Sequence, residues 1–368
     1  MFIPSAKSKL SLVSLFVVSL LLFIWVENST TYVKEDHFEL KLKAAKQMQQ
    51  AEEIIKANRI ENGVFIDDLN DPNETALIGD RESLTITDRG NLTSKLTSLN
   101  PNMAAVIVDL FKQAELERGD KVAVSMTGSF PGMNLAVYSA AKIMGLDLKV
   151  ISSVGASMFG ATDPNFTWLD METLLYDKGI FPYRSSAASI GGGRDLGRGL
   201  NRKGRDLILD AIKRNETVLI HSNSLEENIA KKKEIFDAQL DKGVYKLYIN
   251  IGGGLSSLGT TLSGQLVTPG LHRYLKLKNI PTKGTMFLFA EEGVSILHLL
   301  DIVNISEKYE LPIAPEPLPQ AGMGKVFEAE KYNILIASIA LIILILLIAL
   351  VIFYDHRAVR IKKDEINI

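Results

Sequence analysis

Two long apolar segments near the ends of the chain constrain its fold more than any other feature. Residues 10–26 contain no charged side chain and follow Lys7 and Lys9, and residues 334–354 form a second run without a charge. At a rise of about 1.5 Å per residue, helices of this length approach the roughly 30 Å of a hydrocarbon core. We therefore predict two transmembrane helices. Residues 10–26 could instead be a cleaved signal peptide, but the run exceeds the usual apolar region of about 7–15 residues and no small-x-small site follows it.

Basic residues in the two tails predict the orientation of these helices. Lysines precede the first segment, and the last dozen residues carry Arg357, Arg360, Lys362 and Lys363. Because short cytoplasmic segments carry an excess of Lys and Arg, we predict that residues 1–9 and 355–368 are tails on the cytoplasmic side of the cell membrane. The large middle part is then extracytoplasmic. Lys34, Lys41 and Lys43 oppose this orientation, although long domains translocate largely regardless of charge.

Between residues 121 and 310, strand-like and helix-like segments alternate. We predict strands over 122–124, 148–151, 217–220, 246–251 and 285–289, and helices over 133–144, 225–240 and 294–309. Such alternation predicts an α/β fold with a mainly parallel sheet and covering helices, flanked by one N-terminal and one C-terminal transmembrane helix. Ligand sites in a sheet of this kind lie at the carboxyl ends of the strands.

Two segments link this α/β domain to the apolar runs. Residues 33–60 have an apolar stripe at helical spacing, so we predict a helix that either continues the first span as a stalk or packs on the domain. A second helix is predicted over 102–117, after Asn100-Pro101. We therefore assign residues 27–120 to a helical stalk and mixed region. Residues 311–333, rich in Pro and Gly, are assigned to a tether that leads into the second span.

The first candidate site is the turn that follows the strand over 122–124. Gly128 and Gly132 permit a close approach of the backbone, while Thr127 and Ser129 supply hydroxyl groups. A turn that enters a helix presents backbone N–H groups and the positive end of the helix dipole, which favours an anion such as a carboxylate. The alternative is a tight strand-to-helix turn with a capping serine. The turn matches neither a phosphate-binding loop with its lysine nor the Gly-x-Ser-x-Gly elbow of hydrolases.

The second candidate is a basic segment over residues 184–214. It carries eight Lys or Arg residues, among them Arg194, Arg198 and Arg202, against three Asp residues. It also contains Gly191, Gly192 and Gly193, whose backbone can form an anion-binding nest. Because Arg grips carboxylates through two hydrogen bonds, the segment predicts a groove for an acidic polymer. The alternative is a solvated helix face.

The third candidate is the glycine-rich exit of the strand over 246–251, formed by Gly252, Gly253 and Gly254. His221 follows another strand, so it is expected at the same edge of the sheet. If Ser129 and His221 lie together, with Asp163 or Asp195 as the acid, a serine hydrolase becomes plausible. The chain has no cysteine, which excludes thiol catalysis and disulfides. The sequence contains no metal-binding motif, and we predict no cofactor.

Several motifs together resemble the poly-gamma-glutamate system protein family. They are Thr97-Ser98-Leu99-Asn100-Pro101-Asn102-Met103-Ala104-Ala105, Gly128-Ser129-Phe130-Pro131, Ile251-Gly252-Gly253-Gly254 and the two terminal apolar spans. The resemblance covers most of the chain. It implies a membrane-bound component of poly-γ-glutamate synthesis, a pathway that makes a capsular or released polymer. It implies no reaction, so no catalytic residue is carried over from it.

The expected function follows from the resemblance and the basic segment together. We expect a membrane-anchored accessory protein whose extracytoplasmic domain binds the polyanionic chain and aids its export or retention. The expected partners are the poly-γ-glutamate chain, the membrane subunits of its synthase and the lipid bilayer. The alternative is a serine-dependent hydrolase or transferase that acts on γ-glutamyl amide bonds. A formal net charge of −2 lacks the basic excess of nucleic-acid-binding proteins, so no nucleic acid is expected.

Overall fold

The computed structural model describes residues 9–276 and 279–366 in two compact units. The terminal unit comprises residues 1–35 with 328–368, and the central unit comprises residues 36–327. Of the predicted cytoplasmic tails, residues 1–8 and 367–368 lie outside the described residues. Residues 355–366 are described as helical backbone only.

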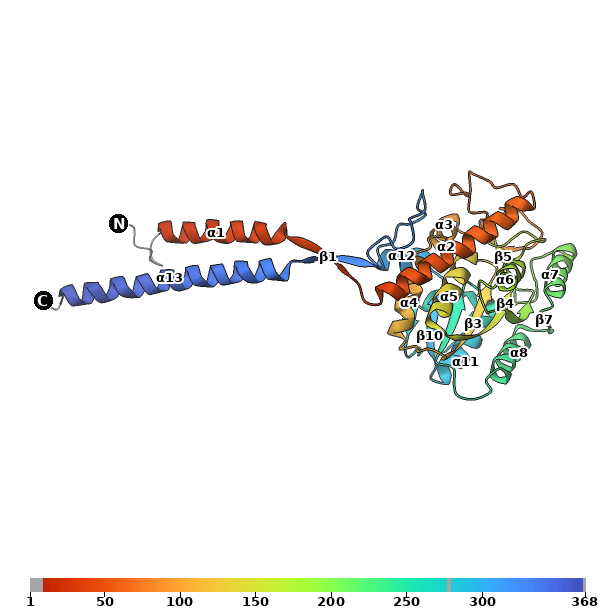
Figure 1. The fold of residues 1–368 in the computed structure, drawn as a ribbon. Coiled ribbons are helices and arrows are strands. Elements are labelled where there is room, and N and C mark those ends of the chain that lie inside the picture. The colour runs from red at the N-terminus through yellow and green to blue at the C-terminus, as the bar shows by residue number, and fades with distance from the viewer. Residues whose placement is uncertain (1–8, 277–278, 367–368) are drawn as a thin grey trace. The chain divides into compact units, whose positions relative to one another are not determined.

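The terminal unit consists of two apolar helices and a two-stranded ribbon. Helices α1 (Lys9–Glu27) and α13 (Ile334–Ile366) lie side by side (Figure 1). Residues 9–27 and 334–354 are long and apolar enough to cross a membrane, judged by length and composition. Strands β1 (Thr30–Lys34) and β11 (Glu328–Tyr332) pair antiparallel, from Thr30 opposite Tyr332 to Lys34 opposite Glu328. The two apolar helices match the prediction, whereas the ribbon was not predicted.

The central unit is built on a seven-stranded sheet with the strand order β7-β6-β4-β3-β8-β10-β9. All neighbouring strands pair parallel except β9 with β10. The strands are β3 (Lys121–Thr127), β4 (Asp147–Ser153), β6 (Ser185–Ser189), β7 (Val218–Ile220), β8 (Leu247–Ile251), β9 (Gly270–His272) and β10 (Ser295–Leu299). The predicted α/β class with a mainly parallel sheet is therefore confirmed.

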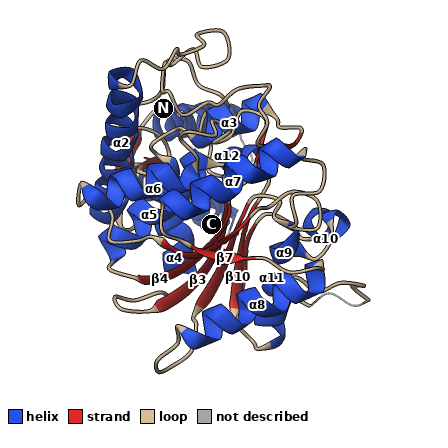
Figure 2. Ribbon diagram, turned by 90° about the vertical axis from the view of Figure 1, so that its right-hand side faces the viewer, coloured by secondary structure: helices blue, strands red, loops and turns tan. Residues whose placement is uncertain are grey.

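Helices cover both faces of this sheet because alternate strand residues point to opposite sides. Val122 and Val124 join the larger hydrophobic cluster, whereas Ala123 and Tyr248 join a second cluster on the other face. Figure 2 shows α4, α5 and α6 on one side of the strands and α8 and α11 on the other. These helices, with α2 and α7, are α2 (Phe38–Glu61), α4 (Met103–Gln113), α5 (Pro131–Met144), α6 (Trp168–Asp177), α7 (Arg202–Arg214), α8 (Leu225–Ala238) and α11 (Thr285–Glu291).

Short elements lie beside the carboxyl ends of the strands. Strand β2 (Ile86–Asp88) pairs parallel with β5 (Ala156–Ser157), which follows β4 in the chain. Helix α3 (Leu92–Ser98) starts directly after β2, and the side chain of Asn91 caps it by accepting the N–H of Ser94. Helices α9 (Leu255–Leu258) and α10 (Thr261–Leu266) follow β8. Strand β5 and helices α3, α9 and α10 were not predicted.

The predicted strand over 285–289 and the predicted helix over 294–309 are both wrong. Residues 285–291 form α11, while residues 295–299 form β10 and are followed by the shorter helix α12 (Ile302–Lys308). A short apolar run does not distinguish a buried strand from a buried helix, since both bury nearly every side chain. In β10 four of the five residues are buried, so the strand shows no alternation of apolar and polar residues.

The structure also differs from the predicted stalk and tether. Helix α2 buries Ala44, Ala45, Met48 and Ile55 in the main core, so the alternative in which it packs on the domain is the correct one. Residues 311–327 pack on the same unit, because Asn102 bonds to the backbone of this segment through Gln320 and Gly322, and Phe327 is fully buried. The Pro and Gly residues there shape a packed loop that ends at β11, and the segment is no free tether.

Candidate functional site

The order of the strands marks one position in the sheet where a ligand site is expected. From β3 the chain adds β4, β6 and β7 on one side, and then returns to add β8, β9 and β10 on the other, with β10 between β8 and β9. The loops that leave β3 and β8 therefore diverge from two adjacent strands. Open α/β sheets bind ligands in the crevice that such a reversal of strand order opens outside the carboxyl ends.

A pocket of about 550 Å³ is lined by residues from this edge of the sheet. Loops that follow β3, β4, β6 and β8 contribute to it, and so does the segment of β2 and α3. All three predicted glycine-rich loops line the pocket, through Thr127 and Ser129, through Gly191, Gly192 and Gly193, and through Gly253 and Gly254. Its charged side chains are three basic residues and one acidic residue, namely Arg89, Lys95, Arg198 and Asp88. The pocket is therefore polar, glycine-rich and on balance positively charged.

Three of the predicted ligand-binding glycines do not line this pocket and serve close packing instead. A Cβ atom at Gly132 would lie 2.4 Å from the carbonyl oxygen of Ser98, so glycine is required where α5 meets α3. A Cβ at Gly128 would lie 2.5 Å from the carbonyl oxygen of Val154. Gly252 has a positive φ of 84°, and a Cβ there would lie 2.4 Å from Oγ1 of Thr127. These glycines bring the loops together so that their neighbours can form the pocket wall.

Lys95 on α3 is the functional candidate that the sequence did not reveal. The residue is 2% exposed, although it lines the pocket. Its Nζ donates to the carbonyl oxygen of Ser129 and lies 2.9 Å from Oγ of Ser157. The ammonium also lies 3.8 Å from the centre of the Phe130 ring. Burial lowers the pKa of Lys95 to about 7, because the interior disfavours the charged form.

Ser129, the predicted nucleophile, is bound to the backbone. Its Oγ accepts the N–H of Ser157 at 3.0 Å, and its own N–H donates to Oγ1 of Thr127 at 3.3 Å. The hydroxyl that contacts Lys95 belongs to Ser157, which is partly exposed. The structure therefore places a lysine–serine contact in the predicted loop region, with Ser157 in place of Ser129.

A second lysine–serine cluster, the Lys232 cluster, ties together the same strand ends around a buried ion pair. Lys232 on α8 forms an ion pair with Asp195 at 3.0 Å, and the two side chains are 3% and 1% exposed. Oδ1 of Asp195 accepts the hydroxyls of Ser153 and Ser189 at 3.0 and 2.8 Å. Nζ of Lys232 also donates to Oγ of Ser256 at 2.6 Å. The cluster joins the ends of β4 and β6 to α8 and α9, and it fixes the loop that carries Gly191, Gly192 and Gly193.

His298 stabilises the loop after β8 through Asn250. Asn250 donates from its amide nitrogen both to Nδ1 of His298, at 3.1 Å, and to the carbonyl oxygen of Gly252, at 2.8 Å. Nε2 of His298 lies 3.2 Å from the carbonyl oxygen of Gly264, so this nitrogen carries the proton. Burial lowers the pKa of His298 to about 4, against the opposite effect of the bond to Gly264. His298 is therefore neutral near pH 7 and serves the loop structurally.

The basic segment over 184–214 does not form one continuous groove. Arg198 lines the pocket, whereas Arg194 and Arg202 are exposed and lie outside its lining. Arg214 forms an ion pair with Asp170 at 2.6 Å. Helix α7 buries an apolar face that includes Ile208, and its charged face points to solvent. The solvated-helix alternative thus describes most of this segment, and Arg198 is the exception.

His221 is not among the residues that line the pocket. It follows β7, which is separated from β3 by two strands, a distance of about 14 Å at the usual strand spacing of about 4.8 Å. The two candidate acids have other partners, since Asp163 pairs with Arg59 and Asp195 with Lys232. The strand order therefore offers no support for a triad of Ser129, His221 and one of these acids.

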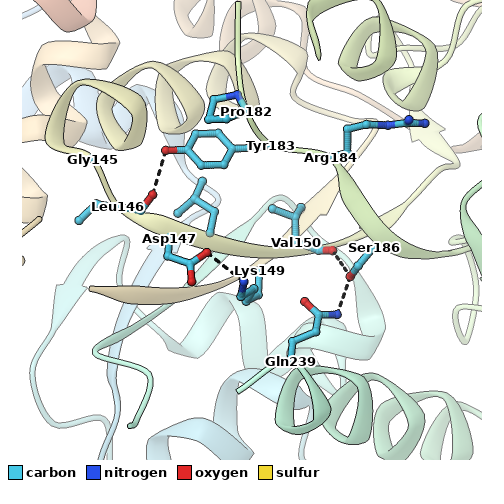
Figure 3. A pocket seen from close by; sticks show the side chains of 11 residues that line it. Gly145, Leu146, Asp147, Lys149, Val150, Pro182, Tyr183, Arg184, Ser186 and Gln239 are labelled. Carbon is cyan, nitrogen blue, oxygen red and sulfur yellow. Dashed lines mark hydrogen bonds and ion pairs between the residues drawn. The ribbon is translucent and has the colours of Figure 1, made fainter. Parts of the chain in front are cut away.

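A second pocket, of about 460 Å³, lies along β4 and the start of β6 (Figure 3). Its polar side chains already have hydrogen-bond or ion-pair partners. Lys149 pairs with Asp147 at 3.0 Å, Gln239 donates to Oγ of Ser186 at 2.7 Å, and Tyr183 donates to the carbonyl oxygen of Leu146 at 3.0 Å. Groups already paired in this way are poor ligand contacts, so the pocket at the carboxyl ends is the better candidate. Within the described parts of the chain, no three His, Asp or Glu side chains gather into a metal-binding cluster.

In comparisons of this chain with protein-family models, with curated proteins and with solved structures, no match was found.

Proposed function

We propose that the chain is a membrane-anchored accessory protein of poly-γ-glutamate synthesis or export that binds the polymer in the pocket beside β3 and β8. The pocket at the reversal of strand order carries this proposal, because three glycine-rich loops meet there with Arg89, Lys95 and Arg198. Each γ-linked glutamate unit carries one free carboxylate, which exposed backbone N–H groups and guanidinium groups bind well. The resemblance described above supports the choice of polymer.

The terminal unit supports a membrane location. Residues 9–27 and 334–354 are the proposed spans in the cell membrane, with both termini cytoplasmic and the central unit outside. In this arrangement the central unit and its pocket are on the side of the membrane on which the polymer emerges. The synthase subunits in the same bilayer are the proposed partners. A reporter enzyme fused to the C-terminus should be active inside the cell. Activity outside would reverse the orientation.

The binding proposal is tested with the full chain in detergent micelles and poly-γ-glutamate of defined length. Arg198→Ala should weaken binding by about tenfold or more, because a hydrogen bond to a charged group contributes roughly 1.5–3 kcal/mol. Arg202→Ala is the matched control, since its side chain is 92% exposed and lies outside the pocket lining. Affinity should also fall as salt rises, because salt screens charge attraction. Equal effects of the two substitutions, or binding that salt does not change, would contradict the proposal.

A further inference from the structure

We propose that Lys95 and Ser157 form a catalytic pair in this pocket, with Ser157 as the nucleophile and Lys95 as its general base. The reaction is cleavage or transfer at an amide bond of the chain that the pocket holds. The identity of that chain rests on the function proposed above, whereas the pair itself rests on the geometry and the burial of the two side chains.

The first support is the contact between the two side chains. Nζ of Lys95 and Oγ of Ser157 are 2.9 Å apart, which is within the reach that proton transfer requires. Both residues line the same pocket, and Ser157 is partly exposed. The nucleophile is therefore open to a ligand, while its base lies behind it in the protein.

The second support is that Lys95 is buried without a described carboxylate to stabilise its charged form. Its near neighbours are the carbonyl of Ser129, the hydroxyl of Ser157 and the ring of Phe130. Within the described residues, no carboxylate forms an ion pair with it. The other charged groups of the pocket are Asp88, Arg89 and Arg198. Burial lowers the pKa of Lys95 to about 7, so a substantial fraction is unprotonated at neutral pH and can accept a proton.

Ser129 acts as a positioning residue in this arrangement. Its Oγ accepts the N–H of Ser157, and its carbonyl oxygen accepts a hydrogen bond from Lys95. These two bonds hold the base and the nucleophile against the same turn after β3. The pairing of β2 with β5 fixes the other side, since Asp88 pairs with Ser157 in that small sheet.

The chemistry balances with water as the second reactant. The neutral amine of Lys95 takes the hydroxyl proton of Ser157 while Oγ bonds to the amide carbon, and the carbonyl π electrons move to oxygen. When this intermediate collapses, the carbon–nitrogen bond breaks and the amine leaves with the proton from Lys95. Water then attacks the resulting ester as Lys95 takes its proton. The carbon–Oγ bond breaks, Ser157 regains its proton and a carboxylic acid leaves. Attack by an amine in place of water gives transfer.

The test uses the full chain in detergent micelles, a fluorophosphonate probe and poly-γ-glutamate. The probe should add once, at Ser157, as read by intact mass and peptide mapping, and the polymer should shorten on a gel. Labelling should rise with pH through about 7, as Lys95 loses its proton. Ser157→Ala should abolish both signals. Lys95→Met and Lys95→Arg should each slow them by at least about 100-fold, because general-base catalysis contributes about 10²- to 10⁴-fold.

Two matched controls separate chemistry from general damage. Ser186→Ala removes an exposed serine hydroxyl on β6 outside this pocket, and Lys142→Met removes a partly buried lysine bonded to the carbonyl of Ile180. Both variants should label at the wild-type rate. A wild-type chain that is neither labelled nor shortens the polymer would overturn the pair. Labelling at another serine, or unchanged labelling in Lys95→Met, would also overturn it.

Binding measured on the same samples distinguishes this inference from the proposed function. If the wild-type chain retains the polymer but is not labelled and does not cut it, the catalytic pair fails and the binding function stands. If Ser157 is labelled with the expected pH dependence but the polymer neither binds nor shortens, the pair stands and the proposed polymer is wrong.

Discussion

The protein holds two lysine–serine clusters at one edge of one sheet, and only one of them pairs its lysine with a described carboxylate. Lys232 contacts Ser153, Ser189 and Ser256 and is paired with the carboxylate of Asp195. Lys95 contacts a serine hydroxyl and a carbonyl, but the structure records no ion pair for it with a described carboxylate. Both lysines are buried. The comparison teaches that the carboxylate, more than burial, decides whether such a lysine serves structure or chemistry.

Removing the carboxylate of the Lys232 cluster should have the largest effect on stability. Asp195→Asn leaves the buried ammonium of Lys232 without its partner, which typically costs about 3–5 kcal/mol. Thermal unfolding of the full chain in detergent measures this loss. Asp237→Asn is the matched control, because Asp237 is 53% exposed and pairs with Lys233. If Asp195→Asn loses no more stability than the control, the Lys232 cluster does not stabilise the fold.

Substitution of Lys95, the lysine in the pocket, should change stability in the opposite direction. Lys95→Met should stabilise the folded chain below pH 7 by a few kcal/mol, and by at most about 5 kcal/mol from a pKa lowered from 10.5 to about 7. The folded pKa lies below the unfolded one, so burying Lys95 opposes folding fully below pH 7. This cost disappears as pH rises towards 10.5. The gain should therefore shrink between pH 7 and pH 10, as melting curves at several pH values would reveal.

Lys142→Met offers a milder version of the same experiment. Burial lowers the pKa of Lys142 in the same direction, but Lys142 is more exposed than Lys95. Its substitution should produce a smaller gain in stability with the same dependence on pH.

Destabilisation by Lys95→Met at pH 6 would contradict the prediction for Lys95. It would show that this lysine is held as a charged structural group, like Lys232.

A buried histidine extends the comparison to acid pH. The pKa of His298 is lowered to about 4 from 6.5, so folding benefits from its neutral form above pH 6.5. This contribution should fade between pH 6.5 and pH 4, and it amounts to at most about 3 kcal/mol. His298→Asn should remove that part of the acid sensitivity. An unchanged pH profile of unfolding in the variant would exclude His298 as its source.

The sequence predicted those parts of the fold in which local pattern and burial agree. The alternation of strands and helices around β3, α5, β4, α8 and β8 was readable, because Gly145 ends α5 in a left-handed conformation and the strands are apolar. Strand β6 was missed because its sequence, Ser-Ser-Ala-Ala-Ser, lacks the large β-branched residues that mark strands. Helix α11 was taken for a strand because its apolar run is short.

The sequence predicted where the site lies, but it did not predict which side chains form the reactive contact. Glycine-rich loops after parallel strands predicted where a pocket would form, and Ser129, Gly192 and Gly254 do line it. The contact between Lys95 and Ser157 joins residues 62 positions apart, and no motif links them. Lys95 lies in the short polar helix α3, which begins after the cap at Asn91 and was not predicted. Burial of a lysine next to a hydroxyl is a property of the folded chain, so periodicity could not reveal it.

A direct titration of Lys95 tests the central claim most closely. The full chain is labelled with ¹³C at the lysine ε carbons, and the Lys95 signal is assigned by its loss in Lys95→Arg. Its chemical shift is then followed from pH 5 to pH 11. The titration of Lys95 should have its midpoint near pH 7. A midpoint near the ordinary value of about 10.4 would contradict the proposal, because the lysine would then be charged at neutral pH and unable to act as a base for Ser157.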